Sequence, residues 1–172
     1  MDFLELAWKR KSIRSFKTDE IPQEKIAKLL EALRAAPSGG NRQPWYFYVI
    51  RNSAMKEKIF NLSCKQEFIL NAPVFFVVCT DPERTAERYG DRGRNLYSIQ
   101  DTAAAIQNLL LCAVDIGLAA CWCGAFDEAA LSEILELKNG FRPVAIIPVG
   151  YAANDPEKRN RRPVEEIVTY IN

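Results

Sequence analysis

A turn-rich joint lies between a predicted helix and a predicted strand in the stretch Ala36–Ile50, which reads APSGGNRQPWYFYVI. The aromatic and β-branched residues of Trp45–Ile50 are typical of a strand. Proline, serine, glycine, asparagine and glutamine fill the joint before it. Such residues let backbone and short polar groups approach a flat polar ligand, although an ordinary helix–loop–strand connection explains the stretch as well.

Helical and strand patterns alternate along the rest of the chain. The predicted helices cover residues 2–9, 22–36, 53–62, 99–116 and 127–135, with Ser53 and Asp127 as N-caps. The predicted strands cover residues 45–50, 73–79, 118–123 and 143–150. We expect a charged surface excursion, partly helical, over 81–94 and an extended tail over 163–172. The alternation indicates one α/β or α+β domain over residues 1–172, since no repeat or linker divides the chain.

Charge and hydropathy exclude several classes of partner. The 172 residues carry 23 basic and 22 acidic side chains, so we expect no nucleic-acid partner, which would need a basic surface. The longest uncharged run, Thr102–Val114, is too short to span a membrane, and the acidic start does not resemble a signal peptide. We therefore expect a cytoplasmic protein with no membrane partner. The same apolar helix predicts either deep burial or a dimer interface.

The reactive residues also narrow the chemistry. The chain has no histidine, which excludes a Ser-His-Asp triad and any histidine-ligated metal. Its five cysteines include Cys121 and Cys123, whose spacing fits neither a redox pair nor a zinc knuckle, so we expect buried, reduced thiols and no metal. If the protein is an enzyme, its reactive atom belongs to a cofactor.

Two basic clusters could hold a phosphate. In an extended segment, Arg10, Ser12 and Arg14 would share one face, so that two guanidinium groups flank a hydroxyl. Arg159 and Arg161 alternate in the same way just before the tail. Taken alone, each cluster is more typical of a solvated surface than of a binding site.

Together, these segments resemble the flavin-binding segments of the nitroreductase family, the FMN-dependent NAD(P)H oxidoreductases. The segments are Arg10–Arg14, the Pro37–Gln43 joint, Cys121–Phe126 and Arg159–Pro163. The resemblance implies an α+β, three-layer fold with a mostly antiparallel sheet, and a homodimer whose extended C-terminal tails are exchanged. It also implies that FMN is the cofactor, NAD(P)H the co-substrate, and a nitroaromatic, quinone or related electron-poor molecule the acceptor.

The resemblance assigns residues to parts of the flavin. The phosphate and ribityl positions fall on Arg10, Lys11, Ser12, Arg14, Arg159 and Arg161, with Arg14 at the ring edge. The loop that contacts the flavin from the neighbouring subunit falls on Pro37, Ser38, Gly39, Asn41 and Gln43. Asn41 suits the imide-like edge of the flavin ring, because its side chain has both donors and an acceptor, and Gln66 is a weaker candidate for the same edge. The backbone near flavin N5, which is the reactive atom, falls on Trp122, Cys123 and Gly124, and Gly150 ends a strand that runs towards the phosphate. No protein side chain is assigned as catalytic.

The binding sites of NAD(P)H and of the electron acceptor are not marked by a motif of their own. No Gly-x-Gly-x-x-Gly follows a predicted strand, so a separate dinucleotide fold is not expected. The resemblance implies that both substrates use the flavin face in turn. It offers no match for Asp81–Tyr97, but this segment is the longest without clear core periodicity and carries Tyr89 and Tyr97, so we expect it to cover the flavin face. Phe126 lines the same pocket or the core. The alternatives are a non-catalytic FMN-binding or redox-sensing protein, and a specialised flavin reductase or dehalogenase.

Overall fold

A four-stranded antiparallel sheet forms the centre of the protein in the computed structural model, which describes residues 2–138 and 140–171. The strands are β1 (Trp45–Ile50), β2 (Val74–Thr80), β3 (Ala119–Ala120) and β4 (Arg142–Gly150), in the order β1-β2-β4-β3. Every residue of β2 is buried, as expected for an inner strand with both faces covered. The predicted α+β class with an antiparallel sheet is confirmed.

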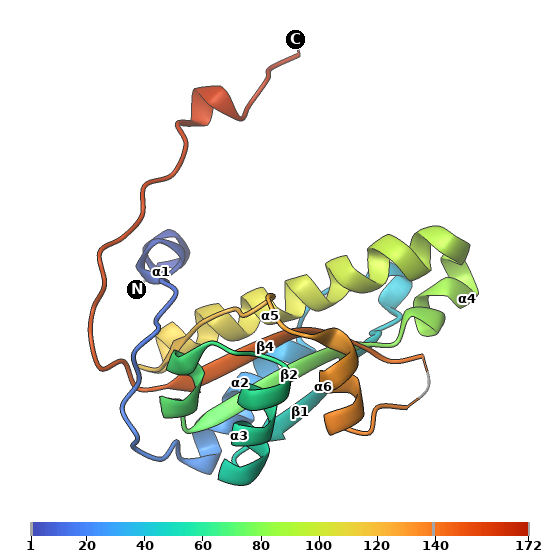
Figure 1. Cartoon of the computed structure of the whole chain (residues 1–172). Helices are drawn as coiled ribbons and strands as arrows, with labels where there is room; N and C mark the ends of the chain where they lie inside the picture. The colour runs from blue at the N-terminus through green and yellow to red at the C-terminus, as the bar shows by residue number, and fades with distance from the viewer. Residues whose placement is uncertain (1, 139, 172) are drawn as a thin grey trace.

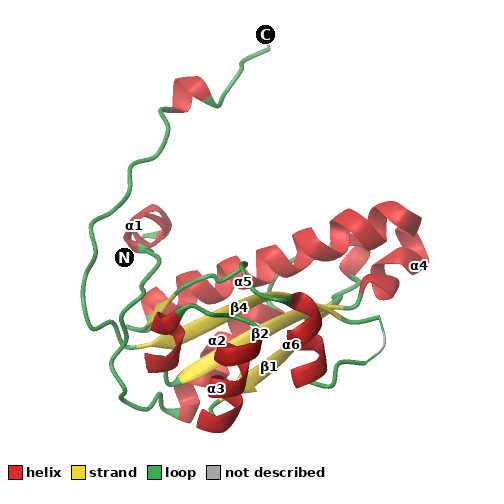
Figure 2. Cartoon of the chain, viewed as in Figure 1, coloured by secondary structure: helices red, strands yellow, loops and turns green. Residues whose placement is uncertain are grey.

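Helices cover both faces of this sheet and make three layers (Figures 1 and 2). On one face, Phe76 and Val78 of β2 share a core with α2 (Gln23–Arg34) and α5 (Ser98–Asp115). On the other, Phe75 and Val77 pack with α3 (Ser53–Leu62) and α6 (Glu128–Ile134). The two cores follow from the alternation of side chains along a strand.

Two local predictions need correction. Helix α3 has the predicted bounds, but its N-cap is Asn52 rather than Ser53, because the Asn52 side chain accepts the N–H of Met55. The strand predicted over 118–123 shortens to Ala119–Ala120. The N–H of Cys121 donates to the carbonyl of Pro148, which has no N–H to give back, so the ladder stops and resumes only as a single bridge at Cys123.

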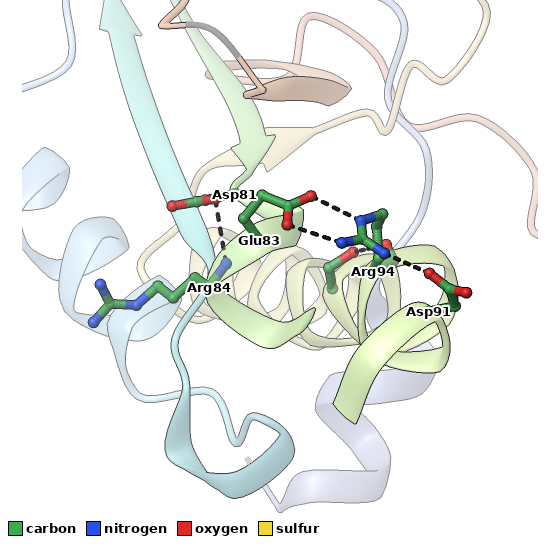
Figure 3. A network of polar contacts seen from close by, with 6 residues as sticks. Asp81, Glu83, Arg84, Asp91 and Arg94 are labelled. Carbon is green, nitrogen blue, oxygen red and sulfur yellow. Dashed lines mark hydrogen bonds and ion pairs between the residues drawn. The ribbon is translucent and has the colours of Figure 1, made fainter. Parts of the chain in front are cut away.

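The charged segment after β2, predicted to be partly helical, is helical except for a kink at Gly90, where φ is 56° and ψ is −143°. Helix α4 (Pro82–Arg92) begins at its N-cap Asp81, and a π-helical turn, η3 (Gly93–Tyr97), leads directly into α5. Figure 3 shows Arg94 between two acidic side chains: it donates to both carboxylate oxygens of Glu83, at 2.7 and 2.9 Å, and also pairs with Asp91. The two bonds to Glu83 link η3 to the start of α4, whereas the pair with Asp91, whose side chain is 89% exposed, contributes little.

Burial within one chain explains most of the apolar character of α5. Ala105, Ile106, Leu109, Leu110 and Ala113 are buried against α2 and the sheet. Other residues of the helix, among them Ala103, Leu111 and Val114, stay partly exposed. The apolar run therefore does not by itself require a dimer interface.

The two ends of the chain lie away from the sheet (Figure 1). Helix α1 (Phe3–Lys9) has no buried residue, and Phe3, which the sequence places on its apolar face, is 68% exposed. The tail is extended as predicted, apart from a short turn, η4 (Val164–Glu166). Its apolar side chains are exposed: Val164, Ile167, Val168, Tyr170 and Ile171. These ends carry apolar surface that the rest of this chain does not cover.

Candidate cofactor site

A cationic cavity of about 410 Å³ opens between the segment after α1 and the root of the tail. The backbone positions the first wall: Ser12 forms a bridge to Ala120, and the N–H of Ile13 donates to the Ala120 carbonyl. Lys11 ties the two walls together, because its Nζ lies 2.6 Å from Asp155 Oδ1 and 3.0 Å from the Pro156 carbonyl oxygen. The cavity is lined by Arg10, Lys11, Ser12, Arg14, Pro156, Glu157, Lys158, Arg159 and Arg161.

This cavity brings together all six residues predicted for the phosphate and ribityl positions. Among the described residues, Arg10, Arg14, Arg159 and Arg161 form no ion pair with a carboxylate. Unpaired guanidinium groups around a hydroxyl are suited to a phosphate, which accepts several charge-assisted hydrogen bonds. Lys158 also lines the cavity and was missed, although it directly precedes Arg159.

Polar and thiol groups lie behind the first wall. Gln66 Nε2 donates to the Ala125 carbonyl oxygen at 3.2 Å, which places Gln66 beside the segment that contains Gly124. The guanidinium of Arg14 lies 5.8 Å from the centre of the ring of Phe68, which is two residues after Gln66. Arg14, Gln66 and the Cys121–Gly124 segment therefore belong to one region of the protein.

Three buried thiols meet in this region. Cys64, Cys121 and Cys123 are free and nearly inaccessible. Hydrogen bonding with the Cys123 thiol lowers the pKa of Cys64 and of Cys121 to about 7, and Arg14 and Ser12 also lower the pKa of Cys121. The hydrogen bonds with Cys121 and Cys64, together with burial, raise the pKa of Cys123. No set of three or more metal-ligating side chains is arranged to hold an ion within the described ranges.

The Gly124 backbone is open to a ligand. A Cβ at this position would meet only Trp122 Nε1, at 3.9 Å, so a flat group could lie against the backbone. Gly124 also lines a second cavity of about 200 Å³, together with Phe126. Phe126 packs against the core as well, so both predicted roles fall to the same ring. Trp122 is half exposed and Cys123 is buried.

Gly150 does not line either cavity. It is buried at the end of β4, where a Cβ would come within 2.8 Å of Pro73 Cδ and 3.1 Å of Phe16 Cδ1. The absence of a side chain there permits close packing of the segment that follows Arg14 against the sheet. Its contribution to the site is therefore indirect.

The joint between α2 and β1 lies at the other end of the chain's long helix. The Gly39 N–H donates to Asp101 Oδ1, in the first turn of α5, whereas Ser12 pairs with Ala120, just beyond the last turn. Fourteen residues of helix separate Asp101 from Asp115, which is about 21 Å. Within one chain the cavity is therefore not completed by the other predicted residues, which are Pro37, Ser38, Asn41 and Gln43 as well as Gly39.

Known proteins resemble this chain in sequence and in fold. The model of the nitroreductase family matches residues 7–66 and 61–151. A protein of Methanothermobacter thermautotrophicus, named as an NADH dehydrogenase/NAD(P)H nitroreductase, is 34% identical over 93% of this chain and 82% of its own length. An FMN reductase [NAD(P)H] of Bacillus subtilis is 28% identical over 94% of this chain and 72% of its own. The crystal structure of a nitroreductase family protein from Clostridium difficile superposes with a TM-score of 0.87 at 33% identity, covering 99% of this chain and 98% of the other.

These comparisons, with the antiparallel sheet between two helical layers, define the class of protein. The chain belongs to the nitroreductase family. Among the described residues, no helix is both long enough and apolar enough to cross a membrane.

Proposed function

We propose that the protein is an FMN-dependent NAD(P)H oxidoreductase. The observation that carries this proposal is the cationic cavity, where Arg10, Arg159 and Arg161, which form no ion pair with any carboxylate in the described part of the chain, surround the Ser12 segment. Its volume and charge fit the phosphate and ribityl chain of FMN. The B. subtilis relative, which is named for FMN and NAD(P)H, supports the same cofactors here.

The chain's residues would bind and orient FMN, which supplies hydride transfer at its N5 atom when it is bound. Arg10, Lys11, Arg159 and Arg161 would hold the phosphate, and Ser12 the ribityl chain. Arg14 would face the ring edge, where a cation favours the negative charge that accompanies reduction. The open backbone of Gly124 would lie against the ring, and Gln66 would support that backbone through Ala125.

The remaining ring contacts would come from a second copy of the chain. The Pro37–Gln43 joint does not reach the cavity of its own chain, so a homodimer would place it over the partner's flavin. The exposed apolar tail supports such a dimer, because exchange between subunits would bury it. Asp81–Tyr97 packs on the joint, so we propose that it covers the flavin served by that joint.

Nitroaromatics, quinones or related electron-poor molecules would accept the hydride. With no histidine in the chain, protons would come from water. The test is whether purified protein is yellow and whether NADH or NADPH bleaches it without oxygen. Bleaching followed by reoxidation with a quinone or nitroaromatic supports turnover. Stable colour in the presence of either nicotinamide would instead indicate an FMN-binding protein without reductase activity, and colourless protein that takes up no FMN would reject the proposal.

A further inference from the structure

Asp101 is a buried carboxylate in which only one of the two oxygens accepts a hydrogen bond from the described residues. It is 8% exposed, and its Oδ1 accepts the N–H of Gly39 at 3.0 Å. Its Oδ2 is buried and has no hydrogen-bond partner among the described residues. Burying a carboxylate oxygen without a hydrogen-bond donor costs free energy of folding, so the position of this oxygen needs a structural or functional explanation.

The helix does not supply the missing donors. Asp101 lies in the first turn of α5, but Tyr97 before that turn is already helical and continues from η3. The amide groups that are free at an ordinary helix start are therefore not presented to Asp101. Burial accordingly raises the pKa of the Asp101 carboxyl, and the hydrogen bond from Gly39 opposes this effect.

The segment that Asp101 holds is itself strained. Gly40, Asn41 and Gln43 have φ angles of 55°, 56° and 49°, a left-handed conformation that non-glycine residues rarely adopt. Such backbone persists only where its surroundings fix it. Within the joint, Ser38 Oγ accepts the N–H of Gln43 at 2.9 Å.

Contacts from α4 fix the segment on its other side. Arg42 pairs with Glu87 and donates to the Arg84 carbonyl, while Arg84 donates back to the Arg42 carbonyl. A Cβ on Gly40 would lie 2.7 Å from the Tyr89 hydroxyl, which shows how closely this helix approaches. At Gly39, however, the bond to Asp101 is the hydrogen bond that ties the joint to α5.

We propose that Asp101 is a positioning residue for the flavin reaction, which anchors Gly39 and thereby sets the left-handed backbone of Gly40, Asn41 and Gln43. This proposal rests on the proposed function, since the joint matters for catalysis only if it contacts FMN. Its effect would reach the flavin bound mainly by the partner subunit, because the joint lies far from its own chain's cavity.

Hydrogen exchange at the Gly39 amide tests the anchor directly. In Asp101→Ala the amide loses a charge-assisted bond, and its exchange should accelerate by about 10–100-fold relative to wild type. In Asp101→Asn an oxygen acceptor remains, so exchange should stay within about fivefold. FMN affinity of the same variants, measured by fluorescence quenching, should fall for Ala by about tenfold and be largely rescued by Asn.

Thr85→Val is the matched control, because Thr85 Oγ1 is also buried and, within residues 2–138 and 140–171, has no hydrogen-bond partner and makes no bond to the joint. It should leave both the Gly39 exchange and the FMN affinity unchanged. Unchanged Gly39 exchange in Asp101→Ala would overturn the proposal, as would equal loss of FMN in the Asn and Ala variants. If wild-type protein binds no FMN, the proposed function fails while the exchange data still decide whether Asp101 anchors the joint.

Discussion

Lys158 Nζ lies 3.9 Å from the centre of the Trp8 ring, so helix α1 and the root of the tail hold each other at the rim of the cationic cavity. Lys11 makes a second link between the same walls through Asp155. Because the tail root contributes Arg159 and Arg161, any change in its position should alter phosphate binding.

Loss of the Trp8 ring should weaken FMN binding modestly. Trp8→Ala removes the cation–π contact, an effect of about 0.5–1 kcal/mol, or roughly two- to fivefold in affinity. Phe3→Ala is the control, since Phe3 lies on the same helix and is 68% exposed. Titration of the apoprotein with FMN measures both variants. Equal effects of the two substitutions would mean that the contact does not position the tail.

Removal of a cation that we propose binds the FMN phosphate should weaken FMN binding strongly. Arg10→Ala or Arg161→Ala should each lower affinity by about 10–150-fold, because each removes charge-assisted hydrogen bonds. Riboflavin, which lacks the phosphate, supplies the comparison. Its affinity should differ little between wild type and variants, and a comparable loss with riboflavin would place these side chains elsewhere on the flavin.

Assembly should depend on the tail. Sedimentation of the FMN-loaded protein should give about twice the chain mass of 19.5 kDa. A chain ending after Pro163 loses the exposed apolar residues of the tail and should dissociate at higher concentration than the full chain. A fully flavinated monomer would contradict the shared site.

Helix α4 should influence the choice of acceptor. Tyr89 packs edge-on against Tyr97, with ring centres 5.1 Å apart, beside the joint. Tyr89→Ala should change kcat/KM for a quinone and a nitroaromatic by unequal factors. Asp91→Ala, on the same helix with its side chain 89% exposed, should not. Steady-state kinetics with both acceptors measures these kcat/KM values. If Tyr89→Ala changes them by the same factor for both acceptors, Asp81–Tyr97 does not select the acceptor.

The ionised Asp101 carboxylate should lower the free energy of unfolding at neutral pH. Its pKa is raised in the folded protein, so folding favours the protonated form, and the associated stability is lost as pH rises through the folded pKa. Asp101→Asn should therefore raise the melting temperature at pH 7, with the gain shrinking as the pH falls towards the ordinary range of an aspartate. Thermal unfolding of both proteins across this pH range measures the effect. A gain that is independent of pH would show that ionisation of Asp101 is not its source.

The sequence by itself determined the local elements and the composition of the cationic site. The bounds of β1 and α3 could be predicted because strong side-chain patterns and turn residues act over a few neighbours. The basic clusters around Arg10 and Arg161 could be interpreted as a phosphate site only together with the other segments that resemble the nitroreductase family, since either cluster alone is more typical of solvated surface. Tertiary structure decided the rest. Pro148 cut short the predicted strand after Ala120 only because the sheet placed it opposite Cys121. The burial of Asp101 and its bond to Gly39 join residues 62 positions apart, so no local pattern could reveal them. Likewise, the joint lies at the first turn of α5 and the cavity lies beyond its last turn. The length of this helix therefore places the two parts of the proposed site at opposite ends of one chain.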